Sequence, residues 1–257
     1  MALRGRRALV TGGGRGIGRV TALELARAGV DVAVAARTRA EVDEVAEEAR
    51  ALGVMAIALT ADVGRGEEVK ALFRSARESL GGVDILVNGA GIAPTAPFAK
   101  TSDELWHSVL AVNLSGVFFA TREALPEMTE RGWGRIVNVA SIAGKTAMPY
   151  IAAYAASKHG VLGLTKVAAL EVATRGVTVN AVCPGYVETP MTDAGIASIV
   201  AKTGQKAADI RRKLEEASPQ KRMVTSEEVA ALVVFLCGDL ARGITGQGLN
   251  VDGGTVV

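Results

Sequence analysis

Short runs of apolar, β-branched residues alternate with longer segments of helical periodicity along the whole chain. The runs are apolar throughout rather than at every second position, which is typical of strands buried on both faces of a parallel sheet. Right-handed connections would place the intervening helices on both faces of that sheet. Seven such runs predict strands at 7–10, 31–36, 54–59, 84–88, 135–139, 177–182 and 248–251.

The segments between these runs carry apolar residues three and four apart, the spacing that gives a helix one buried face. They predict one helix between the first strand and about residue 28, and further helices over 40–52, 67–80, 103–112, 114–131, 152–174 and 227–236. An irregular or helical stretch is expected over 192–217. No linker rich in Pro, Gly or Ser divides the chain. We therefore expect one α/β domain over residues 1–257, a doubly wound parallel sheet of the Rossmann-like kind. An eight-stranded barrel is the alternative, but we find no eighth strand–helix unit.

Composition excludes several classes of partner. The 257 residues carry 29 basic and 27 acidic side chains and only 4% aromatic residues, so a nucleic-acid partner is not expected. The longest apolar run, 229–237, is far shorter than the ~20 residues that cross a bilayer. Two cysteines and two histidines do not cluster, which argues against a disulfide framework and a metal site. The apolar stretch after the basic start is too short for a signal peptide, and we expect a cytoplasmic protein.

The turn after the first predicted strand is rich in glycine, and reads Thr-Gly-Gly-Gly-Arg-Gly-Ile-Gly over residues 11–18. Glycine lets the chain leave a strand sharply and lets a pyrophosphate approach backbone N–H groups at the start of the next helix. This motif alone leaves a dinucleotide site and a plain tight turn both open.

Tyr154 and Lys158 lie one helical turn apart on the same face of a predicted helix. A nearby ammonium stabilises a phenolate and is expected to lower the pKa of Tyr154 from about 10 toward neutrality. Ser141 directly follows the fifth predicted strand, at the edge where such sheets bind ligands. Taken singly, these residues could equally be a surface pair and a loop hydroxyl that caps its own backbone.

Together, these motifs resemble the short-chain dehydrogenase/reductase family over essentially the whole chain. The Gly-x3-Gly-x-Gly spacing and the modest length resemble its simple reductases, among them 3-oxoacyl reductases, 3-hydroxybutyrate dehydrogenases and polyketide ketoreductases. The motifs that carry the resemblance are 11–18, Asp62-Val63, 88–91, Asn113, Ser141, Tyr154-x3-Lys158, Pro184-Gly185 and Thr189.

The resemblance implies a role for each of four catalytic residues. Tyr154 is the general acid in reduction and the base in oxidation. Lys158 binds the nicotinamide ribose and, with the positive nicotinamide ring, lowers the pKa of Tyr154. Ser141 binds the substrate oxygen and stabilises charge that develops on it. Asn113 holds a water that links Lys158 to solvent.

The resemblance also implies a set of cofactor-binding positions. Residues 62–63 border the adenine, 88–91 its ribose, and 184–189 the nicotinamide carboxamide. Gly89 departs from the second Asn that the family more often has, which puts one supporting hydrogen bond in doubt. The implied set is Gly12, Gly14, Arg15, Gly16, Ile17, Gly18, Arg37, Asp62, Val63, Asn88, Ala90, Gly91, Tyr154, Lys158, Pro184, Gly185, Val187 and Thr189.

The end of the second predicted strand bears on the choice between NADP(H) and NAD(H). Members that bind NAD place an acid there for the ribose diol. Here the strand ends in Ala-Ala-Arg-Thr-Arg over residues 35–39 and has no carboxylate. Arg37 and Arg15 can instead flank a 2′-phosphate, which a guanidinium binds well. We expect NADP(H) to be preferred and NAD(H) to be possible, although each Arg alone could be a solvated surface charge.

The residues that surround the predicted site bear on the substrate. Hydroxybutyrate enzymes of the family bind their acid through a Gln, a His and a Lys, where this chain has Ala93, Gly144 and Ile151. An uncharged ketone or an acyl thioester is therefore expected. The alternatives are an NAD-dependent 3-hydroxybutyrate-type or cyclic-alcohol dehydrogenase, and a catalytically silent dinucleotide-binding regulator, which would not need all four catalytic residues.

Two further expectations concern organisation. A substrate lid is expected around residues 190–222. The helices over 114–131 and 152–174 carry apolar or small residues on more than one face, and a second face can be buried against another subunit. The family resemblance implies a homotetramer, in which the last strand near Leu249 helps to form a second interface.

Overall fold

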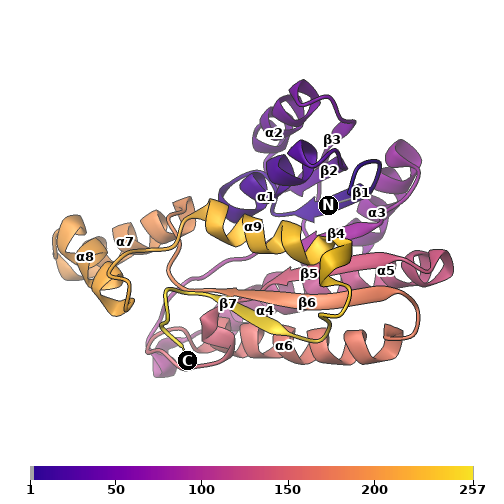
Figure 1. The fold of residues 1–257 in the computed structure, drawn as a ribbon. Helices are drawn as coiled ribbons and strands as arrows, with labels where there is room; N and C mark the ends of the chain where they lie inside the picture. The colour runs from indigo at the N-terminus through magenta and orange to yellow at the C-terminus, as the bar shows by residue number, and fades with distance from the viewer. Residues whose placement is uncertain (1–2, 257) are drawn as a thin grey trace.

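The seven strands form one parallel sheet with the order β3-β2-β1-β4-β5-β6-β7. The computed structural model describes residues 3–256. Residues 1, 2 and 257 of the expected 1–257 domain, and with them the first two residues of the basic start, lie outside the described residues. The predicted doubly wound fold is confirmed (Figure 1). The strands are β1 Arg7–Thr11, β2 Asp31–Ala36, β3 Ala56–Thr60, β4 Ile85–Asn88, β5 Gly134–Val139, β6 Val177–Pro184 and β7 Gly248–Val251.

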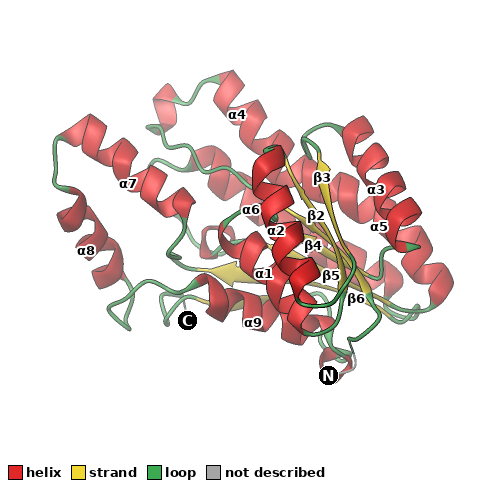
Figure 2. Ribbon diagram, turned by 90° about the horizontal axis from the view of Figure 1, so that it is seen from above, coloured by secondary structure: helices red, strands yellow, loops and turns green. Residues whose placement is uncertain are grey.

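Helices cover both faces of this sheet. Three of them, α1, α2 and α9, share an apolar core with one face, while α3, α5 and α6 share another core with the opposite face (Figure 2). The helices are α1 Gly16–Arg27, α2 Arg39–Ala51, α3 Gly66–Leu80, α4 Asp103–Leu110, α5 Gly116–Arg131, α6 Ala152–Val172, α7 Pro190–Thr203, α8 Ala207–Ala217 and α9 Ser226–Cys237.

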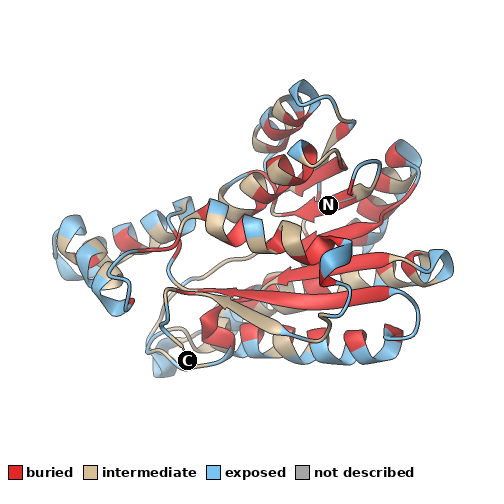
Figure 3. Ribbon diagram, in the orientation of Figure 1, coloured by how far each residue is buried: buried red, intermediate tan, exposed pale blue. Residues whose placement is uncertain are grey.

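Burial explains why the strands are mostly apolar. All eight residues of β6 are buried, because helices cover both of its faces and strands flank both of its edges. The residues of β7 are half-buried, as expected for a strand at the edge of a sheet. The helices alternate between buried and exposed faces (Figure 3). The central strands therefore form a rigid platform whose carboxyl ends hold the loops.

One predicted break between helices is absent. Instead of separate helices over 103–112 and 114–131, a π-helical turn, Ala111–Ser115, joins α4 to α5 without leaving the helical path. A π-turn adds a residue to a helical turn and so shifts the apolar pattern, which in the sequence resembles a break between two helices. This turn contains Asn113.

The segment expected as a lid consists of two helices, α7 and α8, which project from one end of the molecule (Figure 1). Thr189 caps the start of α7, because its side chain accepts a hydrogen bond from the N–H of Thr192. Thr189 belongs to the same loop that leaves β6 at Pro184. The lid therefore begins at the carboxyl edge of the sheet.

Candidate active site

The glycine-rich turn joins β1 to α1 in a backbone conformation that requires glycine. Gly12 and Gly16 have φ angles of +67° and +54°. A Cβ added to Gly12 would lie 2.6 Å from the backbone nitrogen of Ala90, and one added to Gly18 would lie 2.2 Å from the carbonyl oxygen of Gly12. The turn therefore packs backbone against backbone, which fits the close approach expected of a phosphate loop.

The first turn of α1 is open to an anion. Arg15 is its N-cap residue and makes no capping hydrogen bond through its side chain, and the first turn contains no acidic residue. Its backbone N–H groups and the positive end of the helix dipole favour negative charge there. Ile17 lies in the same turn. The glycine cradle and this helix start fit the pyrophosphate of a dinucleotide.

The residues expected beside the adenosine lie at neighbouring strand ends. Asp62 follows β3, and its carboxylate accepts a hydrogen bond from the N–H of Gly64 at 2.9 Å. Val63 packs against Gly116 at the start of α5. Asn88 is the last residue of β4, and its side chain donates a hydrogen bond to the Asn138 side chain at 2.8 Å. This bond connects β4 to β5. This bond holds the strand end in place, although Gly89 replaces the family's second Asn.

The region around Arg15 and Arg37, at the end of β2, contains an acidic side chain, Glu41, that was not predicted from the sequence. Arg37 is exposed, and Arg15 lies 3.8 Å from a carboxylate oxygen of Glu41. A Cβ added to Gly14 would lie 3.0 Å from the other oxygen of Glu41 and 3.5 Å from Cβ of Ala36, the last residue of β2. The strand end has no carboxylate, as expected, but α2 brings one to it.

The π-turn directs Asn113 into the interior, where its side chain is fully buried. Its Oδ1 accepts from the N–H of Ile92 at 2.9 Å, and its Nδ2 donates to the carbonyl of Ile92 at 2.9 Å and to Oγ of Ser157 at 3.2 Å. The Ser157 hydroxyl in turn donates to the carbonyl of Tyr154 at 2.7 Å. Asn113 therefore fixes α6 relative to the loop after β4. Ser157 was not predicted, because nothing in the motif distinguishes it from a spacer.

The structure brings Ser141, Tyr154 and Lys158 together. Ser141 follows β5 and is buried, and its hydroxyl accepts from the N–H of Ala143 at 3.1 Å. The Lys158 ammonium donates to the carbonyl of Val139 at 2.7 Å and lies 5.5 Å from the centre of the Tyr154 ring. The phenol, the ammonium and the serine hydroxyl thus meet at the carboxyl edge of the sheet.

The pKa values of Tyr154 and Lys158 differ from the expectation that the Tyr154 pKa is lowered. Desolvation raises the pKa of Tyr154 above its ordinary value, and a hydrogen bond with Ser141 offsets only part of this. Desolvation also lowers the pKa of Lys158 to about 8. Burial therefore outweighs the lowering of the Tyr154 pKa expected from Lys158 in this structure, where the Lys158 ammonium donates to the Val139 carbonyl.

The loop expected beside the nicotinamide leaves β6 at Pro184. Gly185 packs directly against Asp252, since an added Cβ would lie 3.1 Å from its Cα. Val187 forms an isolated bridge with Val224, and Thr189 opens α7. This loop therefore joins the sheet edge to both ends of the lid.

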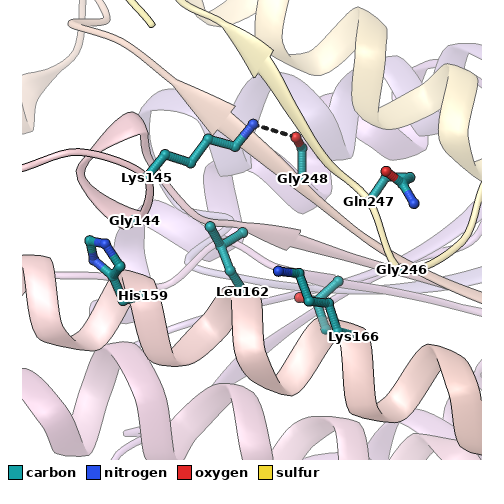
Figure 4. Close-up of a pocket in the computed structure, with 9 residues that line it drawn as sticks. Gly144, Lys145, His159, Leu162, Lys166, Gly246, Gln247 and Gly248 are labelled. Carbon is teal, nitrogen blue, oxygen red and sulfur yellow. Dashed lines mark hydrogen bonds between the residues drawn. The ribbon is translucent and has the colours of Figure 1, made fainter. Parts of the chain in front are cut away.

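A cavity lies outside this set of residues. It has a volume of about 430 Å³ and lies between α6 and β7, where the Lys145 ammonium donates to the carbonyl of Gly248 at 2.6 Å (Figure 4). His159, Leu162 and Lys166 of α6 line its other wall. The four predicted catalytic residues do not line it.

Within residues 3–256, no helix combines the length and apolar character needed to span a membrane. In the same part of the chain, no three His, Cys, Asp or Glu side chains are placed to share a metal ion.

Comparison with known proteins identifies the family. The family model described as short chain dehydrogenase matches residues 6–222. The chain belongs to the short-chain dehydrogenase family, and it is an oxidoreductase that depends on a nicotinamide cofactor.

Three relatives show how broad this similarity is. The D-beta-hydroxybutyrate dehydrogenase of Cupriavidus necator is 40% identical over 99% of both chains. The 3-oxoacyl-(acyl-carrier-protein) reductase of Staphylococcus epidermidis is 41% identical over 96% of this chain and 97% of its own. A solved structure of an actinorhodin polyketide ketoreductase variant with NADPH is 42% identical, covers 97% of each chain and has a TM-score of 0.93.

Proposed function

We propose that the chain reduces an uncharged ketone, such as a 3-oxoacyl thioester, with NADPH. The observation that carries this proposal is the meeting of Tyr154, Lys158 and Ser141 at the sheet edge that also holds the glycine-rich turn. When bound, the nicotinamide supplies or accepts the hydride. The protein supplies the proton and the polar contacts around the reacting oxygen.

Tyr154 is proposed as the residue that gives its proton to the substrate oxygen in reduction and removes it in oxidation. The Ser141 hydroxyl is within reach of the Tyr154 phenol and can donate to the same substrate oxygen. A protonated Lys158 stabilises the phenolate that Tyr154 becomes after it donates. Because its pKa is about 8, Lys158 remains mostly charged at neutral pH.

Asn113 is proposed to keep a path open for the proton to return. A Cβ added to Gly91 would lie 3.5 Å from Oδ1 of Asn113 and 3.9 Å from the Lys158 ammonium, so the glycine leaves space between these groups. A water in that space would connect Lys158 with solvent. The remaining predicted cofactor residues are proposed to hold the dinucleotide along the carboxyl edge of the sheet.

The absence of an acid-binding set supports an uncharged substrate. A side chain at Gly144, where hydroxybutyrate enzymes have His, would come within 2.7 Å of the backbone carbonyl of Lys158. Ala93 and Ile151 offer no charge or hydrogen bond through their side chains. The missing charged and hydrogen-bonding side chains at these three positions favour an uncharged ketone over a hydroxy acid.

The proposed preference for NADP(H) over NAD(H) rests on Arg37, which directly follows β2, and on Arg15 of the glycine-rich turn. Its test compares kcat/KM with NADPH and NADH for the wild type and for Arg37→Asp, with Arg39→Asp as the matched control. Arg39 lies two residues further along and pairs with Asp43. A wild-type preference for NADH, or an Arg37→Asp variant with the preference unchanged, would contradict the assignment.

The proposed assembly is a homotetramer of single-domain subunits, each with a lid formed by residues 190–222. Large apolar side chains are exposed on the outer faces of α5 and α6: Phe118 is 42% exposed, Val167 55% and Leu170 79%. Such a surface is suited to burial against another subunit. Cys183 and Cys237 are free and buried, which supports a reducing compartment, the cytoplasm.

A further inference from the structure

The corner where β2 ends contains a carboxylate that comes from a different element. Glu41 lies in the first turn of α2, and its side chain packs against Gly14 of the glycine-rich turn and near Ala36. We propose that Glu41 is a specificity-determining residue, which accepts hydrogen bonds from an unphosphorylated ribose and opposes a 2′-phosphate. This inference rests on the proposed function and refines its choice of cofactor.

The position of Glu41 distinguishes it from the other acids of α2. Its Cβ and one carboxylate oxygen lie 2.8 and 3.0 Å from a Cβ added to Gly14, so the side chain lies along the turn rather than in solvent. Its side chain is 33% exposed, against 69% for Glu44. Glu44 and Glu48 are directed toward Arg19 instead.

The contact between Glu41 and Arg15 is loose enough to be exchanged. Their closest atoms are 3.8 Å apart, and the Arg15 side chain is 66% exposed. An exposed ion pair of this length contributes little to stability. Arg15 can therefore leave Glu41 for a phosphate at little cost, and nearby Arg37 is exposed and makes no ion pair within residues 3–256.

These three side chains give the corner two binding modes. Glu41 can accept hydrogen bonds from both hydroxyls of a ribose diol, as an acid at the strand end would. A 2′-phosphate instead brings about two negative charges next to Glu41, and Arg15 and Arg37 must offset the repulsion. The arginines therefore favour NADP(H), while Glu41 limits that preference and keeps NAD(H) usable.

The test measures binding directly, so that it does not depend on turnover. Dissociation constants for NADPH and NADH are determined by fluorescence titration for the wild type, Glu41→Gln and Glu44→Gln. The last variant removes the same charge from the same helix, one turn away. We expect Glu41→Gln to raise the preference for NADPH over NADH about tenfold, because a carboxylate no longer opposes the phosphate. Glu44→Gln should leave the ratio within about twofold.

Two further variants keep the result interpretable. Glu41→Asp retains the charge and should stay close to the wild-type ratio, and Glu41→Ala should reproduce the change seen in Glu41→Gln. If Glu41→Gln leaves the ratio unchanged while the wild type binds both dinucleotides, the inference is wrong and the proposed function stands. An equal change in Glu44→Gln would also overturn it, since the loss of one negative charge anywhere on α2 would then explain the effect. A wild type that binds neither dinucleotide would overturn both.

Discussion

The buried ammonium of Lys158 links the proposed chemistry to stability. Burial lowers its pKa from 10.5 to about 8, whereas in the unfolded chain it keeps its ordinary value. Below pH 8 both states carry the proton, and the folded state bears the full cost of the desolvated charge. Between about pH 8 and 10.5 the folded state has lost this proton and the unfolded state retains it. The stability contribution of Lys158 therefore rises with pH across this window.

Replacing Lys158 with Met should stabilise the protein at neutral pH. The difference between the two pKa values corresponds to about 3 kcal/mol. Against this, the Val139 carbonyl loses a donor at 2.7 Å, a loss that costs about 1 kcal/mol. We expect the variant to be more stable than the wild type by about 2 kcal/mol at pH 7, which is a Tm about 4–8 °C higher for a chain of this size.

Thermal unfolding followed by circular dichroism at pH 7 and pH 10 measures this difference. The control is Lys166→Met, which removes an exposed lysine from the same helix and should leave Tm nearly unchanged at both pH values. The stability advantage of Lys158→Met should shrink at pH 10, because the wild-type lysine is then largely neutral. A variant less stable than the wild type at pH 7, or an advantage that does not change with pH, would show that burial does not depress the pKa of Lys158.

Three further outcomes follow from the same structure. The oxidation rate should rise with pH as Tyr154 loses its proton, and a pH–rate profile of Lys158→Met should show a large loss of rate and a higher apparent pKa. Desolvation opposes ionisation of Asp84, but hydrogen bonds and charge from Arg7 outweigh it and lower the Asp84 pKa. Asp84→Asn should therefore lose about 3 kcal/mol in urea unfolding at pH 7, and less as the pH falls through that depressed pKa. Leu170→Asp should yield smaller species than the wild type by light scattering, because the charge would disrupt an apolar interface; an unchanged mass would count against α6 as that interface.

The sheet was predictable because its strands are buried on both faces. In β5 and β6 most positions are apolar because every side chain but that of Val139 is buried, so the apolar runs stand out in the sequence. The polar exceptions are Arg135, Asn138, Thr178 and Asn180, which are buried as well. The glycine-rich turn was equally predictable, since Gly12 and Gly16 adopt positive φ angles and there is no room for a side chain at Gly18. These are local requirements of the backbone, and residue type alone reports them.

Contacts between distant segments could not be predicted in the same way. Glu41 follows Gly14 by 27 residues, and only the fold shows that its carboxylate lies against the glycine-rich turn. The pKa of Tyr154 depends on how completely neighbouring segments exclude water, which no pair of residues in the sequence encodes. The π-turn around Asn113 keeps the backbone helical where the shifted apolar pattern indicated a break between two helices.

In the proposed mechanism Tyr154 exchanges the proton with the substrate oxygen. This role is tested by kcat/KM for reduction of a simple ketone by NADPH in the wild type and Tyr154→Phe, together with the Kd for NADPH in each. Loss of the proton donor should lower kcat/KM by about 10²–10⁴-fold, while the Kd for NADPH stays within a few fold. A Tyr154→Phe variant that reduces the ketone at a rate close to that of the wild type would show that Tyr154 is not the proton donor.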